Sequence, residues 1–268
     1  MFFNRIVTGV IFISVFAWTG QASAGWVIDE VVKGGDKGDK QQVVLQSNQM
    51  KVTMMDSGKP VFVSIIDLNS QTITQVDYSE RYFMTAPVKE FVQTMGNMMA
   101  GANKEMQEAM KGVPPEQRKM MEDMMRSQMG SGGGKDCREP KTELWKTGQQ
   151  ATIAGYPAVR YDVMADGKLS SELWIAKGIT AWNELDSKKL AQFGAEMAKL
   201  AGCGQGQQGL PGADPSWKVA NEGYPVRTVD KTRGTIEVVK AESRAVPAAE
   251  FQAPSGFKRK TLQEMMRR

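Results

Sequence analysis

The chain has 268 residues, of which 41% are hydrophobic and 24% are charged, and its formal net charge is +4. It contains no histidine, which excludes Ser–His and Cys–His catalysis and nearly all ordinary zinc or blue-copper sites. A net charge this small does not favour nucleic acid as a partner. We therefore expect a non-enzymatic protein with no cofactor and no nucleic-acid partner.

The first 24 residues have the pattern of a secretory signal. Arg5 is their only charged residue, an apolar run covers residues 6–18, and Ala22-Ser23-Ala24 stands before Gly25. We expect cleavage between Ala24 and Gly25, which leaves residues 25–268 as one domain with a net charge of +3. No later apolar run is long enough to cross a bilayer, so we expect an exported chain without a membrane span.

The region after the expected cleavage site alternates between β-rich runs and turn clusters. Hairpin spacing between the runs predicts an antiparallel meander with one face exposed to water. The six predicted strands cover residues 26–33, 41–47, 49–55, 60–67, 72–76 and 81–85.

A helical pattern replaces the strands after Pro87. It runs from Val88 to about residue 128 and is broken once, at Gly112-Val113-Pro114-Pro115, where Pro115 fits the first turn of a new helix. We interpret residues 87–130 as an inserted hairpin of two helices.

The remaining chain returns to strands around one more helix. Asp186 or Ser187 can cap a helix that ends at Leu200, and a Gly- and Gln-rich loop covers residues 202–212. The predicted strands are residues 142–145, 150–153, 158–164, 170–175, 224–229 and 235–244.

One short motif occurs twice in this half of the chain. Gly155-Tyr156-Pro157 and Gly223-Tyr224-Pro225 each precede a strand, a turn and another strand. The repeat fits either a duplicated hairpin or two similar strand entries.

Several short motifs resemble a bacterial exported family, the domain of unknown function four-four-one-two. The matching segments are Ile66-Asp67-Leu68, Thr72-Ile73, Asp77-Tyr78, Arg81-Tyr82-Phe83, Ile153-Ala154-Gly155-Tyr156, Leu173-Trp174-Ile175-Ala176 and Phe251-Gln252-Ala253-Pro254-Ser255-Gly256-Phe257. That family is similar in layout to the lipoprotein carriers LolA and LolB.

The resemblance implies a β-rich α+β fold. Its expected form is a strongly curved antiparallel sheet, an unclosed half-barrel, with helices on the concave side. The hairpin inserted at residues 87–130, which is rich in methionine, departs from the carriers. It also implies a periplasmic binding or carrier protein for an apolar ligand such as an acyl chain, a lipid or a lipopeptide. No catalytic residue can be transferred from it.

Methionine is the strongest compositional signal. Ten of the 19 methionines lie between residues 95 and 129, a segment without Leu, Ile or Phe. At helical spacing they form the apolar faces of both predicted helices. The ten are Met95, Met98, Met99, Met106, Met110, Met120, Met121, Met124, Met125 and Met129.

Three interpretations of these faces remain open. They could pack as ordinary core, or they could form an adaptable lid over the half-barrel, because methionine is flexible and accepts variable apolar shapes. They could also hold Cu(I), since thioethers are soft ligands. The alternative function is therefore a periplasmic Cu(I)-binding protein.

Cys137 and Cys203 are the only cysteines. In an oxidising compartment an even pair favours a disulfide, with two free thiols as the alternative. A thioredoxin-like site is excluded because no CxxC motif is present.

The remaining charged residues give weaker signals. Basic residues gather at Lys258-Arg259-Lys260 and Arg267-Arg268, which fits a solvated end or contact with an acidic or lipid-headgroup partner. We expect any membrane-surface or envelope-protein contact to be transient. Carboxylates such as Asp29-Glu30 and Asp67 fall on strands or turns, where a solvated face or a hairpin end explains them.

Overall fold

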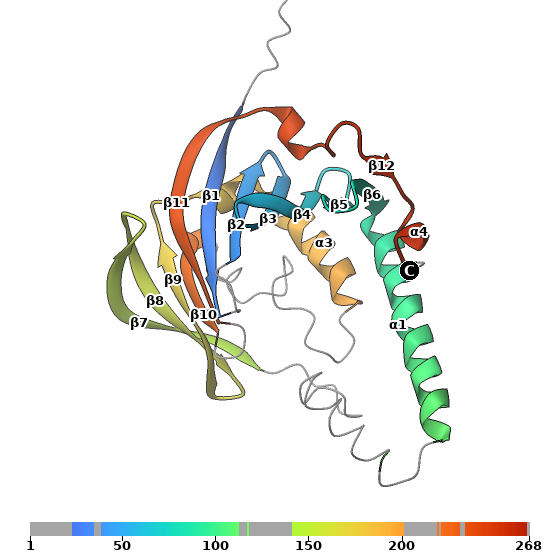
Figure 1. Ribbon diagram of the computed structural model, residues 1–268. Coiled ribbons are helices and arrows are strands. Elements are labelled where there is room, and N and C mark those ends of the chain that lie inside the picture. Colours follow the sequence, from blue (N-terminus) through green and yellow to red (C-terminus); the bar gives the residue numbers. More distant parts are fainter. Residues whose placement is uncertain are drawn as a thin grey trace, which may run out of the picture.

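The computed structural model describes residues 23–34, 39–112, 117, 141–200, 219, 221–230 and 234–266. Within them one 12-stranded sheet has the order β12-β6-β5-β4-β3-β2-β1-β11-β10-β9-β8-β7. All neighbouring strands are antiparallel except β12 and β6, which are parallel. The sheet is strongly curved, and its two edge strands, β12 and β7, do not pair with each other (Figure 1). The predicted β-rich, unclosed antiparallel sheet is confirmed.

The first six strands form the predicted meander, and each overlaps one predicted strand. They are β1 (Ser23–Lys33), β2 (Asp39–Gln46), β3 (Gln49–Asp56), β4 (Lys59–Asp67), β5 (Thr72–Asp77) and β6 (Tyr82–Pro87). Ser47 and Asn48, with φ of 49° and 68°, form the tight turn between β2 and β3. Asn adopts this left-handed backbone more readily than most residues, which explains why the chain turns there.

The second group of strands is β7 (Thr142–Ile153), β8 (Tyr156–Ala165), β9 (Lys168–Ala176), β10 (Tyr224–Asp230) and β11 (Gly234–Val246). The prediction of separate strands at residues 142–145 and 150–153 is wrong, because both belong to β7. The register with β8 shifts between Lys146 and Gln150, and Gly148 lies there with a φ of 77°. This glycine accommodates an irregularity inside one strand and does not separate two strands.

The two groups join where β1 pairs with β11. The pairing runs from Ser23 opposite Val246 to Lys33 opposite Thr235, with a shift in register between Asp29 and Glu30. Since β1 also pairs with β2, it lies in the middle of the sheet. The first and last long strands are therefore neighbours.

Two main helices accompany the sheet, α1 (Val88–Lys111) and α3 (Ser187–Ala198). Asp186 caps α3 by accepting hydrogen bonds from the backbone N–H groups of Lys188 and Lys189, so this predicted cap is observed. The apolar face of α3 (Leu190, Phe193 and Met197) is buried in the main core with residues of β1 to β6 and α1. Figure 1 shows α3 inside the curve of the sheet.

The C-terminal segment crosses the other face of the meander. After β11 it contains a 3-10 helix, η3 (Ala248–Phe251), then β12 (Lys258–Arg259) and α4 (Leu262–Met266). Phe251 is buried in a second cluster that includes Val27, Val44 and Val63. Further on, Phe257 packs edge-on against Tyr78 with the ring centroids 5.1 Å apart. The segment therefore covers the apolar side chains of the meander that point away from the main core.

The two Gly-Tyr-Pro motifs begin β8 and β10, the two strands that flank β9. Ala176 of β9 pairs with Ala158 on one side and with Tyr224 on the other. Gly223 has a φ of 138°, and a Cβ there would lie 2.2 Å from the carbonyl oxygen of Ala176. Gly155 has a φ of 83° with nothing within 4 Å of a Cβ. Only the second motif thus needs glycine for close approach as well as for backbone conformation.

We predict different costs for alanine at these two glycines. Gly155→Ala should lower the free energy of unfolding by about 1 kcal/mol, because only the left-handed backbone is strained. Gly223→Ala should cost more than about 3 kcal/mol, because overlap with Ala176 adds to that strain. Urea unfolding of both variants measures the difference. Equal losses would show that the approach to Ala176 is not tight.

Candidate functional site

The first half of α1 is anchored in the main core. Val88, Phe91 and Val92 are buried, and Met95 is partly buried against the same cluster. These positions share one face of a helix. The backbone N–H of Val88 donates to the carbonyl of Gln71, 2.9 Å away. In the described part of the chain, no other hydrogen bond or ion pair joins α1 to another element. Apart from this hydrogen bond, apolar contact holds the described part of the helix in place.

The second half of α1 extends beyond the sheet (Figure 1). Met98, three residues after Met95, is 41% exposed. Ala100, Lys104 and Glu108 are also exposed. The apolar stripe of α1 thus passes from the main core to solvent at Met95 and Met98. We call these two residues, with the neighbouring helix α3, the apolar mouth; α1 and α3 are in contact.

The structure describes the side chains of only two of the ten predicted methionines, Met95 and Met98. Met99, Met106 and Met110 belong to α1, but their side chains lie outside the described part, so the lid, core and Cu(I) interpretations stay untested there. The following predicted residues also lie outside it: Met120, Met121, Met124, Met125, Met129, Cys137 and Cys203. The second helix of the hairpin, the disulfide and the loop at 202–212 therefore remain predictions.

The expectation that Glu30 lies on a solvated face is wrong, because this residue is 5% exposed. Its carboxylate accepts hydrogen bonds from the Gln41 amide at 2.5 Å and from the Tyr224 hydroxyl at 3.0 Å. The Tyr224 ring packs against Trp182, with centroids 4.9 Å apart. Burial raises the pKa of the Glu30 carboxyl, against the opposing effect of the two hydrogen bonds. The group ties β1 to β2 and β10 inside the fold.

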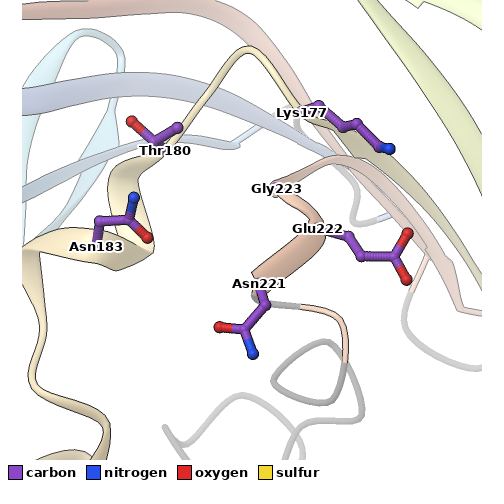
Figure 2. A pocket seen from close by; sticks show the side chains of 6 residues that line it. All are labelled: Lys177, Thr180, Asn183, Asn221, Glu222 and Gly223. Carbon is purple, nitrogen blue, oxygen red and sulfur yellow. The ribbon is translucent and has the colours of Figure 1, made fainter.

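A polar pocket of about 260 Å³ lies between the turn after β9 and the segment before β10. Figure 2 shows its lining, which is Lys177, Thr180, Asn183, Asn221, Glu222 and Gly223. Residues 177–183 and 221–223 are brought together by the close approach of Gly223 to Ala176. Amide, hydroxyl and charged groups of this kind do not suit an acyl chain. No sequence pattern indicated this pocket, because its residues come from two separate turns.

The negative charge of Glu222 at this pocket is already stabilised by other groups of the protein. It accepts a hydrogen bond from the hydroxyl of Tyr161, and its carboxylate lies 3.2 Å from the Lys146 ammonium. The hydrogen bond from Tyr161 lowers the pKa of Glu222, with further help from Lys146. Tyr161 itself is buried, and burial raises the pKa of its hydroxyl. The three residues fasten the segment before β10 onto β7 and β8.

The described residues contain no cluster of three or more His, Cys, Asp or Glu side chains that could hold a metal ion. Among the same residues, no helix is long and apolar enough to span a membrane.

We predict that Glu30 makes the wild-type protein less stable as pH rises. Its pKa is raised in the folded state, so below pH 4.5, the ordinary value for glutamate, it is protonated in both states. As pH rises, the unfolded chain releases this proton first. Stability then falls by at most about 1.4 kcal/mol per pH unit until the folded-state pKa is passed.

Glu30→Gln has no such proton and is the matched comparison. Urea unfolding of both proteins between pH 4 and pH 8 should show the wild type losing stability relative to the variant as pH rises. Parallel pH profiles would contradict the assignment.

Comparison with curated proteins found no match. Among solved structures, an uncharacterized conserved protein from Thermus thermophilus is 10% identical, with a TM-score of 0.44, covering 89% of this chain and 91% of that chain. MucB of Pseudomonas aeruginosa, solved as a complex with MucA, is 10% identical with a TM-score of 0.35, covering 88% of this chain and 58% of that chain. Both TM-scores are low, so neither likeness bears on function.

Comparison with known protein families finds the family that the sequence motifs predicted. Residues 79–257 match the family described as "Domain of unknown function (DUF4412)", and this range covers more than half of the chain. It includes the Arg81-Tyr82-Phe83 and Gly155-Tyr156 motifs and ends at Phe257. The chain therefore belongs to the DUF4412 family.

Proposed function

We propose that this chain is an exported, non-enzymatic binding protein that takes an apolar ligand at the apolar mouth between α1 and α3. The observation that carries the proposal is the stripe of α1, which is continuous from buried Phe91 and Val92 through Met95 to exposed Met98. A ligand there would extend the apolar surface of the core without covering buried polar groups. An acyl chain, a lipid or a lipopeptide has the required chemistry.

The way α1 is held supports this role. Beyond the Val88–Gln71 hydrogen bond at its start, the described part of α1 is held by apolar contacts, which are not directional and allow small tilts of the helix. Methionine side chains at the mouth adapt to ligands of different shape. The polar pocket at Glu222 does not share these properties, so we place the ligand at α1. The Cu(I) alternative gains no support from the two described methionines, since one of them, Met95, packs against the core.

A substitution pair at Met98 tests the site with the uncharged apolar dye N-phenylnaphthylamine. Met98→Leu should keep dye affinity within a few-fold, because Leu–Met exchanges cost less than about 1.5 kcal/mol. Met98→Glu should weaken binding more than about tenfold, because the new carboxylate loses water when the ligand covers it. Asn97→Glu adds the same charge one position away, at an exposed residue outside the stripe, and should bind as wild type does.

Equal losses in the two Glu variants would indicate a general charge effect and contradict the site. Lipid extraction and mass spectrometry of protein purified without detergent from its host identify the natural ligand class. Repeated recovery of protein with no apolar compound, together with no dye binding, would refute the function.

Export is part of the same proposal. Cleavage between Ala24 and Gly25 would keep the buried residues Val27 and Ile28 and nearly all of β1. Gly25 is buried, and a Cβ there would lie 2.8 Å from the carbonyl oxygen of Leu45, so the strand is closely packed from this residue onward. Intact-mass measurement of the periplasmic fraction should find a chain that begins at Gly25. A cytoplasmic chain that retains Met1 would contradict export.

A further inference from the structure

The positive charge of the chain is concentrated in one short segment. Residues 258–268 contain five Lys or Arg and one Glu, a net charge of +4, which equals the formal net charge of the whole chain. Residues 1–257 therefore have a formal net charge of zero. The Glu264 carboxylate accepts hydrogen bonds from the backbone N–H and the hydroxyl of Thr261, at 2.7 and 2.9 Å. This capping box directs the only acidic side chain of the segment to its own backbone.

The fold holds the first part of this segment at a sheet edge. The backbone N–H of Lys258 donates to the carbonyl of Arg81 at 3.0 Å, and that of Lys260 donates to Phe83 at 2.8 Å. These bonds form β12 on the edge of β6. Lys258, Arg259 and Arg81 are exposed. The backbone is thus fixed while these three cationic side chains face solvent.

These cations have no acidic partner in the described residues. Arg81 lies over the Phe257 ring, 5.3 Å from its centroid, and Lys260 lies 4.0 Å from that of Tyr82. In the parts of the chain that the structure describes, none of Arg81, Lys258, Arg259 and Lys260 forms an ion pair. The nearby Asp77 carboxylate accepts from Ser79 and from the backbone of Glu80. We call these four cations the basic edge.

Protection of an edge strand accounts for only part of this arrangement. A single Lys on an edge strand is enough to discourage pairing with another chain. Four cations gather here, and successive side chains of β12 point to opposite sides of the strand. Charges spread in this way suit a fluid anionic surface better than a groove for one acidic peptide.

The basic edge also adjoins the apolar mouth. α1 directly follows β6, and α4 directly follows β12 and packs against both α1 and β6. Leu262 and Met265 of α4 join the main core. Figure 1 shows α4 beside α1. A surface that attracted the basic edge would therefore meet the molecule on the side where α1 emerges.

We propose that the basic edge docks the protein on a membrane surface rich in anionic phospholipid headgroups. The inference rests on the proposed function for its purpose, since docking would bring the apolar mouth to a source or acceptor of lipid. Its physical basis is separate, because headgroup attraction depends on Arg81, Lys258, Arg259 and Lys260 and not on the methionines.

Vesicle sedimentation of the mature full chain tests the proposal. Wild-type protein should bind phosphatidylglycerol–phosphatidylcholine vesicles in low salt, bind pure phosphatidylcholine weakly, and dissociate when salt shortens the Debye length. Lys258→Gln/Arg259→Gln should lower partitioning onto the anionic vesicles about 25-fold, because each cation near such a surface contributes about fivefold. Both side chains are exposed, so the variant should fold, which circular dichroism checks.

Lys59→Gln/Lys168→Gln is the matched control, since it removes the same charge from two exposed residues at the starts of β4 and β9. It should change partitioning less than about fivefold. Equal loss in both variants would overturn the basic edge as the contact, and so would wild-type protein that binds polyglutamate but not anionic vesicles. Dye binding of Lys258→Gln/Arg259→Gln should stay at the wild-type level. Failure of docking with intact dye binding therefore refutes this inference alone, whereas loss of dye binding in Met98→Glu bears only on the proposed function.

Discussion

The pairing of β1 with β11 is the interaction on which the rest of the structure depends. It brings residues 23–33 beside residues 235–246, so two separate meanders become one sheet. The main core draws residues from both groups of strands, so neither meander alone could complete it. Because these partners are far apart in sequence, their pairing has a large loop-closure cost that the buried core must offset.

The same pairing explains where polar groups are buried. The register shift between Asp29 and Glu30 lies beside the carboxylate that Gln41 and Tyr224 hold. Glu30 thus links the centre of the sheet to the start of β10. A buried acid with two donors is costly to ionise but also specific, since only the correct strand order supplies both donors. We infer that this cluster helps to select the native pairing over alternatives.

Local patterns predicted the meander and α3 well, because alternation, turn residues and the Asp186 cap act over a few residues. They failed where the outcome depends on distant partners. In the sequence, Glu30 cannot be distinguished from any other carboxylate on a strand, because its partner Tyr224 comes from a distant part of the chain. The two-residue strand β12 has no periodicity of its own and exists only because β6 offers an edge. The polar pocket needs the approach of Gly223 to Ala176, which no local pattern shows.

The C-terminal segment brings together three of the motifs on which the expected family resemblance was based. Phe257 packs on Tyr78 and lies beneath Arg81, so Asp77-Tyr78, Arg81-Tyr82-Phe83 and the motif that ends at Phe257 meet at one place. The contact fixes β12 against β6, and β6 leads directly into α1. These motifs thus determine where α1 leaves the sheet and where the cations of β12 are displayed. The proposed ligand entry and the proposed surface attraction therefore depend on the same sheet edge, and a change that loosened Phe257 should disturb both.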